Sequence, residues 1–369
     1  MITAAKATRR TVLKGAGALA TLALAPATLR AQGEPLRLGV LTPLTGAGSA
    51  DGPRMLAAMQ AVAKEINASG GLLGRPIEFI IEDDQTNPDA AVKAARKLID
   101  VDRVPVIMGT WASAVTTAVA PLCWESKTFL TTVSGADTIT KLPHQGYLIR
   151  TQPTHDRLAE VLKQGGAEMV GFAIYDKDKT SYRSEVDQAL KTKPDMLYLN
   201  GYAPDETVVL KDLYKAGYEG AKFAQSYAIT QKVLESLPQE VTEGIYTVQP
   251  SADIDSPAFA AAAKRLGIGE PDSYQCQATD WISLVSLTIA KAKTATGTAL
   301  RDNVRKISQG NGTKVYTAVE GLAALAKGGE INYEGASGPC DFNEIGDILD
   351  CKFRFQKVEK GAFKFIAVK

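Results

Sequence analysis

Two short turns of small and polar residues are the part of this chain best suited to bind a small molecule. Each turn follows an apolar run, at residues 104–108 and 128–133. A helix is expected after the first turn, and free N–H groups at a helix N-terminus attract carboxylates. The carboxyl ends of parallel strands are where open α/β sheets bind ligands. The candidate ligand-binding residues here are Trp111, Ala112, Ser113, Gly135, Ala136 and Asp137.

Each of these side chains also has a structural explanation. Ser113 could be a helix N-cap whose hydroxyl accepts a bond only from its own helix. Trp111 could belong to the core rather than to a pocket wall. Asp137 could bind a ligand ammonium or simply cap the turn that follows it.

The elements that must position these turns alternate between strands and helices. Strands are expected at residues 36–41 and 77–82, and helices at 52–66 and 88–99. The two apolar runs supply the third and fourth strands. This alternation predicts a parallel, doubly wound α/β sheet.

A second set of strands and helices is expected from residue 155 onward. Strands are predicted at residues 169–175 and 196–202, and a long buried helix at 274–294. The tail, from residue 331, alternates in the manner of antiparallel strands.

The first 31 residues differ in composition from the rest of the chain. They contain five basic residues and no acid, which leaves 37 basic residues against 41 acidic ones in the remainder. Residues 8–14 (TRRTVLK) resemble a twin-arginine export motif, and a stretch of small apolar residues follows. We therefore expect a twin-arginine-type signal peptide at 1–31 and a periplasmic mature protein. No basic patch indicates nucleic acid as a partner.

An oxidising compartment permits disulfides. We expect Cys340 and Cys351 to form one across a turn, and Cys123 and Cys276 to be buried free thiols. No Cys-x-x-Cys is present and the two histidines stand apart, so no metal or other cofactor is expected. A glycine pattern, Gly46-x-Gly48-x-x-x-Gly52, is similar to a dinucleotide fingerprint, but its spacing is one residue too long. An exported nucleotide-dependent oxidoreductase remains the enzymatic alternative.

Several motifs, in this order, resemble one protein family. They are residues 38–46 (LGVLTPLTG), 66–74 (INASGGLLG), 82–84 (EDD) and 332–338 (NYEGASG). The chain resembles the periplasmic substrate-binding proteins of ABC importers, in the leucine/isoleucine/valine-binding class. The resemblance implies two Rossmann-like α/β lobes joined by crossover strands, no catalysis, and closure on a ligand. It assigns residues 34–149 plus 252–333 to the N-terminal lobe and 150–251 plus 334–369 to the C-terminal lobe.

The chain departs from the family pattern near residue 154. The family has a helix, a strand and a ligand-facing loop directly after the crossover. Here residues 150–154 run straight into a helix that resembles the family's second unit. One helix–strand unit therefore seems to be absent from the second lobe.

The same resemblance adds two tyrosines to the candidate site. Tyr202 matches a position whose aromatic ring covers the ligand in the family. Tyr227 lies in the loop where amino-acid binders usually place an acid for the ligand ammonium, and no acid is present there. The ligand is therefore a branched-chain or other amino acid, or else an aromatic or other carboxylate or amide without an ammonium. The implied partner is an inner-membrane ABC permease, and a monomer is expected. A ligand-sensing regulator is a further alternative.

Overall fold

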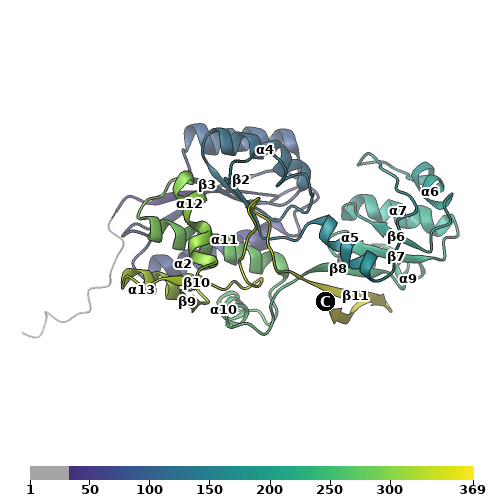
Figure 1. The fold of residues 1–369 in the computed structure, drawn as a ribbon. Helices are drawn as coiled ribbons and strands as arrows, with labels where there is room; N and C mark the ends of the chain where they lie inside the picture. The colour runs from purple at the N-terminus through teal and green to yellow at the C-terminus, as the bar shows by residue number, and fades with distance from the viewer. Residues whose placement is uncertain (1–32) are drawn as a thin grey trace, which may run out of the picture.

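The structure is a computed structural model that describes residues 33–369, and it has two lobes (Figure 1). One lobe is built on a five-stranded sheet of order β2-β1-β3-β4-β5, and the other on a sheet of order β12-β11-β8-β7-β6. The two-lobed α/β fold predicted from the sequence is confirmed. The twin-arginine motif predicted within residues 1–31 lies outside the described residues.

The first sheet is wholly parallel, as predicted. β1, β3, β4 and β5 have few exposed side chains, which is expected where helices cover both faces of a parallel sheet. Its strands are β1 (Leu36–Thr42), β2 (Ile77–Asp83), β3 (Val106–Thr110), β4 (Phe129–Thr132) and β5 (Leu148–Arg150).

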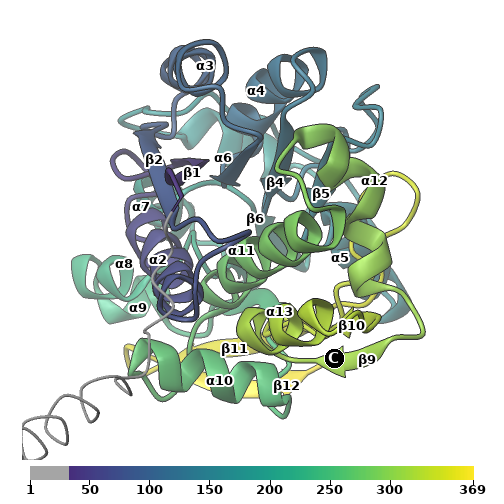
Figure 2. The same cartoon turned by 90° about the vertical axis from the view of Figure 1, so that its left-hand side faces the viewer.

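Helices from two distant parts of the chain cover this sheet. α11 (Ser273–Ala292) begins with a capping box between Asp272 and Gln275, and 17 of its residues are buried. It packs between α2 and α12 (Figure 2), so it closes the core of the first lobe. The other helices here are α2 (Gly52–Ala68), α3 (Pro88–Arg96), α4 (Ser113–Glu125), α10 (Pro257–Leu266), α12 (Gly297–Ser308) and α13 (Ala318–Ala326), with a π-helical turn, η1 (Lys97–Val101), and two short paired strands, β9 (Thr313–Val315) and β10 (Ile331–Tyr333).

The second sheet is mixed. β6 (Met196–Leu199), β7 (Ala221–Gln225) and β8 (Tyr246–Ser251) are parallel. β11 (Lys352–Glu359) and β12 (Ala362–Val368) add antiparallel strands, which confirms the pattern predicted for the tail. The helices of this lobe are α5 (His155–Gln164), α6 (Arg183–Leu190), α7 (Ala203–Lys215), α8 (Gln231–Ser236) and α9 (Gln239–Thr242).

The strand predicted at residues 169–175 is wrong. These residues form no helix or strand, although their backbone lies near β6. Met169, Phe172 and Ile174 are 78%, 77% and 84% exposed. The apolar pattern is that of a strand, but in the described part of the chain no strand pairs with it.

The predicted disulfide is also wrong. The turn between the two cysteines forms, because Phe342 bridges Ile348 in antiparallel fashion, yet Cys340 and Cys351 are free thiols. Cys340 packs in the core of the first lobe, whereas Cys351 packs beside Phe353 in the second. The two side chains therefore belong to different cores. Cys123 and Cys276 are buried and free, as predicted.

Candidate functional site

Four aromatic rings meet between the lobes. Trp111 follows β3 of the first lobe, and its ring centroid lies 5.2 Å from that of Tyr202 and 5.4 Å from that of Tyr227. Tyr202 and Tyr227 follow β6 and β7 of the second lobe, with centroids 5.9 Å apart. Tyr274, in the first turn of α11, lies 6.2 Å from Trp111. Three sequence-predicted residues are thus brought together, and a fourth ring joins them.

The surroundings of Trp111 leave little free space. Its side chain is only 6% exposed. A Cβ added to Gly48 would lie 2.9 Å from the Trp111 ring, so the loop after β1 approaches the ring closely because this residue is glycine. The loop at residues 42–48 therefore forms one wall of the aromatic cluster.

Ser113 is not the N-cap of α4, which was one of the two roles considered for it. Ala112 is the N-cap of α4, and Ser113 is the first helical residue. The Ser113 hydroxyl instead accepts a 3.2 Å hydrogen bond from the backbone N–H of Ala136. The first intrahelical bond of α4 runs from the Thr116 N–H to the Ala112 carbonyl, so the N–H groups before it have no carbonyl of the helix to bond. This helix end keeps the positive electrostatic potential that suits a carboxylate.

Buried hydroxyls hold together the two turns that follow β3 and β4. The Thr116 hydroxyl lies 2.6 Å from the Ser134 hydroxyl and 3.1 Å from that of Thr132. The Ser134 hydroxyl donates a 2.9 Å hydrogen bond to the Trp111 carbonyl. Because these groups are buried and satisfied by one another, they fix the backbone on both sides of the candidate site.

Arg150, the last residue of β5, holds the backbone of the turn that follows β4. Its guanidinium donates to the carbonyls of Ser134 (3.0 Å) and Ala136 (2.6 Å). It also donates to the Asp347 carboxylate at 2.6 and 2.8 Å, and its own side chain is fully buried. Arg150 therefore links the candidate site to the chain segment that returns toward β11.

The first turn of α5 packs against the turn that follows β4. The His155 N–H donates to the Gly135 carbonyl (2.9 Å), and the Asp156 N–H donates to the Asp137 carboxylate (2.9 Å). A Cβ added to Gly135 would lie 2.5 Å from Nε2 of His155. Asp137 therefore caps the start of α5, a role that differs from both explanations considered for it, a ligand ammonium or the turn that directly follows it.

Burial sets the ionisation of this region. It raises the pKa of Tyr202 to about 12, and the pKa values of Tyr227 and Tyr274 are also raised by burial. The phenols are therefore neutral near pH 7. Burial lowers the pKa of His155, although the nearby Asp137 acts in the opposite direction. A neutral imidazole results, which can donate or accept one hydrogen bond.

The sequence interpretation missed Tyr274 and His155. Tyr274 was included in a buried helix, but its place two residues after the Asp272 N-cap puts it at the end of the helix that lies beside Trp111. His155 was treated only as the start of a helix. The absence of a unit after residue 154, inferred from the resemblance, was the signal that this helix would begin beside the first lobe.

The described part of the chain shows neither a candidate metal site nor a candidate membrane-spanning helix. Residues 33–369 contain no cluster of three or more side chains suited to hold a metal ion. Within the same residues, none of the helices combines the length and the apolar character needed to cross a membrane.

Comparison with known proteins identifies the class. A sequence profile described as "Periplasmic binding protein" matches residues 35–161 and 147–362. The chain belongs to this family. It is therefore a solute-binding protein of the ABC-transporter class, and not an enzyme. The two matched stretches overlap at residues 147–161, where the chain crosses from the first lobe to the second.

Individual relatives are distant. The Leu/Ile/Val-binding protein BraC3 of Rhizobium johnstonii is 23% identical, over 88% of this chain and 92% of its own length. The leucine-binding protein LivK of Thermotoga maritima superposes with a TM-score of 0.72 at 20% identity, covering 90% of this chain and 98% of that chain. A solute-binding protein of R. palustris in complex with 4-hydroxybenzoate superposes with a TM-score of 0.68 at 19% identity, covering 91% and 97%. These structures share the fold with this chain.

Proposed function

We propose that this protein captures a small carboxylate with a planar aromatic body between its two lobes and delivers it to an inner-membrane ABC permease. The ring of the ligand would stack among Trp111, Tyr202, Tyr227 and Tyr274. Its carboxylate would lie at the N-terminus of α4, near Ser113 and Ala112, with Gly135 and Ala136 on the neighbouring turn. The proposed lobes are residues 34–149 plus 252–333 and residues 150–251 plus 334–369, with the difference that Cys340 and Phe342 pack in the core of the first lobe.

The observation that carries this proposal is the set of aromatic rings contributed by both lobes. Aromatic pairs favour offset and edge-to-face packing at centroid distances of about 4.5–7 Å, and an aromatic ligand offers the same contacts. Asp137, the acid considered for a ligand ammonium, already accepts a backbone N–H of α5. A ligand without an ammonium fits this arrangement better than an amino acid does.

A branched-chain amino acid is the second candidate. It is favoured by the names of relatives such as the Leu/Ile/Val-binding proteins of Rhizobium johnstonii and Escherichia coli. Binding would require Asp137 to release the Asp156 N–H, or another acid to approach when the lobes open.

The resemblance of residues 1–31 to an export signal supports delivery of the mature protein to the periplasm.

Thermal-shift measurements can separate the two candidates. We expect benzoate or 4-hydroxybenzoate to raise the melting temperature. At a ligand concentration one hundred times Kd, binding should stabilise the folded protein by about 2.7 kcal/mol. Leucine, isoleucine and valine should have little effect. Trp111→Ala should abolish the shift, whereas Tyr214→Ala, on an exposed face of α7, should preserve it.

Two outcomes would contradict the primary proposal. A shift with branched-chain amino acids alone would favour the second candidate. If neither group shifts the wild type, then the site is either built for another solute or disabled by the shortened second lobe, and the proposal fails.

A further inference from the structure

Asp84 is a buried carboxylate that the contacts within the chain satisfy only in part. It directly follows β2, and its side chain is fully buried. Its Oδ1 accepts a 2.7 Å hydrogen bond from the Thr86 N–H. In the described residues 33–369, no donor, charged or neutral, reaches its Oδ2. A buried carboxylate oxygen without a donor is costly, so it is expected to serve a group that the chain itself does not supply.

The ionisation of Asp84 defines the group that it can bind. Burial raises the pKa of Asp84 to about 6, although the hydrogen bond from the Thr86 N–H acts in the opposite direction. The carboxyl group is therefore mainly ionised near pH 7, and an ionised carboxylate can only accept hydrogen bonds. The complementary group on a ligand is a hydrogen-bond donor.

Asp84 lies beside the aromatic cluster. Its N–H donates to the Thr42 carbonyl at 3.2 Å, which ties it to the loop at residues 42–48 that packs against Trp111. From the second lobe, Tyr202 comes near it, because the pKa of Tyr202 is raised by burial and, in addition, by the charge of Asp84. The free carboxylate oxygen is thus near the place where the ligand ring would lie.

Three neighbouring strands of the first sheet end in buried oxygens without partners. β1 and β3 end at Thr42 and Thr110, and within residues 33–369 neither hydroxyl has a hydrogen-bond partner. Asp84 follows β2, on the other side of β1 from β3 and α4. Adjacent strands are about 4.8 Å apart, so Asp84 and the N-terminus of α4 are separated by roughly 10 Å along this edge. The edge offers an anion site at one end and a hydrogen-bond acceptor at the other.

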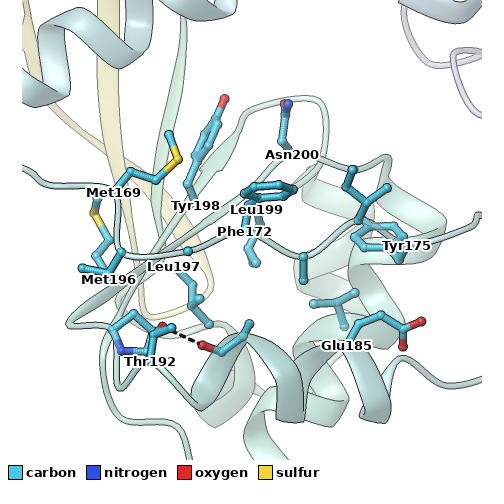
Figure 3. Close-up of a pocket in the computed structure, with 18 of the residues that line it drawn as sticks. Met169, Phe172, Tyr175, Glu185, Thr192, Met196, Leu197, Tyr198, Leu199 and Asn200 are labelled. Carbon is cyan, nitrogen blue, oxygen red and sulfur yellow. Dashed lines mark hydrogen bonds between the residues drawn. The ribbon is translucent and has the colours of Figure 1, made fainter.

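Two other buried carboxylates of the described residues have an oxygen without a hydrogen-bond partner, and each has a different explanation. Asp272 lies 2.9 Å from the guanidinium of Arg54, which is its counterion. Glu206 accepts a 2.7 Å hydrogen bond from the Tyr175 hydroxyl and lines a cavity of about 1640 Å³ in the second lobe. Figure 3 shows Tyr175 on the wall of that cavity. Asp84 differs from both, since it lies at the ligand-facing edge of the first sheet and has no counterion there.

We propose that Asp84 binds a hydrogen-bond donor on the far side of the ligand ring from the carboxylate, so that the preferred solutes are hydroxylated aromatic acids. This inference rests on the proposed function, which places the ligand carboxylate at the N-terminus of α4. The ligand hydroxyl donates to the free Oδ2, and the ring spans the edge between the two polar ends. An α-amino acid cannot make both contacts, because its ammonium is on the carbon next to its carboxylate.

Calorimetric titration of the mature wild-type protein with three acids tests the donor. We expect 4-hydroxybenzoate to bind roughly ten- to a hundredfold more tightly than benzoate, which is the gain from one hydrogen bond to a charged acceptor. 4-Fluorobenzoate has a substituent of similar size that cannot donate, and it should bind no better than benzoate. This series does not depend on any variant being folded.

Asp84→Asn tests the residue. The amide oxygen can keep the bond from the Thr86 N–H, whereas the amide nitrogen puts a donor in place of the free acceptor. The advantage of 4-hydroxybenzoate over benzoate should fall below about fivefold. The melting temperature without ligand should be no lower than that of the wild type, because an unpaired buried charge is removed. Asp89→Asn, at an exposed position in the first turn of α3, is the matched control and should keep the wild-type preference.

The outcomes separate this inference from the proposed function. If benzoate and 4-hydroxybenzoate bind the wild type equally well, the inference fails and the proposed function stands. If neither acid binds, the proposed function fails and the inference fails with it. An Asp84→Asn variant that is less stable but keeps the wild-type preference would show that the carboxylate is purely structural, which also overturns the inference.

Discussion

Gly135 is the residue at which the two lobes meet most tightly in the candidate site. Its Cα faces the imidazole of His155 so closely that a Cβ would lie 2.5 Å from Nε2. Such a contact is possible only if the helix α5 or the turn shifts. The absence of a side chain here therefore lets α5 dock on the first lobe.

We predict that Gly135→Ala lowers the free energy of unfolding by about 1–3 kcal/mol, the usual cost of overpacking. Urea denaturation measures it. Gly269→Ala is the control, since a Cβ there meets nothing within 4 Å, and it should change the stability by less than about 0.5 kcal/mol. The double variant Gly135→Ala/His155→Ala should lose less than the sum of its parts. Strict additivity would mean that the two side chains do not clash.

His155 also predicts a dependence on pH. Burial lowers the pKa of His155 in the folded protein, so the unfolded chain binds this proton more readily. The contribution of a neutral His155 is present above about pH 6.5 and is lost as the pH falls below that value. The stability of the wild type relative to His155→Gln should therefore decrease on acidification from pH 7.5 to pH 5.5. A difference that does not vary with pH would contradict this assignment.

The types of the site residues could be predicted from the sequence, but their partners could not. Trp111 was singled out because it follows a strand whose carboxyl end should face a ligand, and Tyr202 and Tyr227 because the resemblance to the family places them at the site. Tyr274 comes from a helix more than a hundred residues away from Trp111. The hydrogen bond of Asp137 depends on where α5 begins, which is a property of the whole crossover.

At the scale of elements, the Arg150–Asp347 pair joins β5 to the returning chain. We predict that Asp347→Ala lowers the free energy of unfolding by about 3–5 kcal/mol, because it leaves a fully buried guanidinium without its counterion. Asp187→Ala is the matched control. It removes the Arg183–Asp187 pair of α6, whose side chains are both about half exposed, and should cost no more than about 0.5 kcal/mol. Equal effects in urea denaturation would show that Arg150 finds other partners.

The wrong strand at residues 169–175 shows what local pattern can and cannot decide. The residues have the apolar, β-branched and aromatic composition of a strand. A strand also needs a neighbour with which to pair, and among residues 33–369 no strand pairs with this segment. Similarly, the short spacing of Cys340 and Cys351 predicted a turn, which forms, but not the cores into which the two thiols point.

At the scale of the whole molecule, the lobes already touch through the aromatic cluster. Trp111 is 6% exposed, so a ligand can enter only if the lobes move apart. We predict that the ligand-free protein in solution is more open than this structure, and that adding a confirmed ligand decreases its radius of gyration in small-angle scattering. An unchanged radius at saturating ligand would contradict hinge closure.

The place of α11 in the chain has a consequence for the order in which the protein can fold. The strands β1 to β5 are complete by residue 150, yet the helix that seals their core begins at Ser273. During synthesis, the part of the first sheet that α11 covers stays exposed beside α2 while more than a hundred further residues, including β6 to β8, are added. The second lobe also waits for the end of the chain, because β11 and β12 complete its sheet. A nascent chain has to be protected from aggregation until its last third has been made.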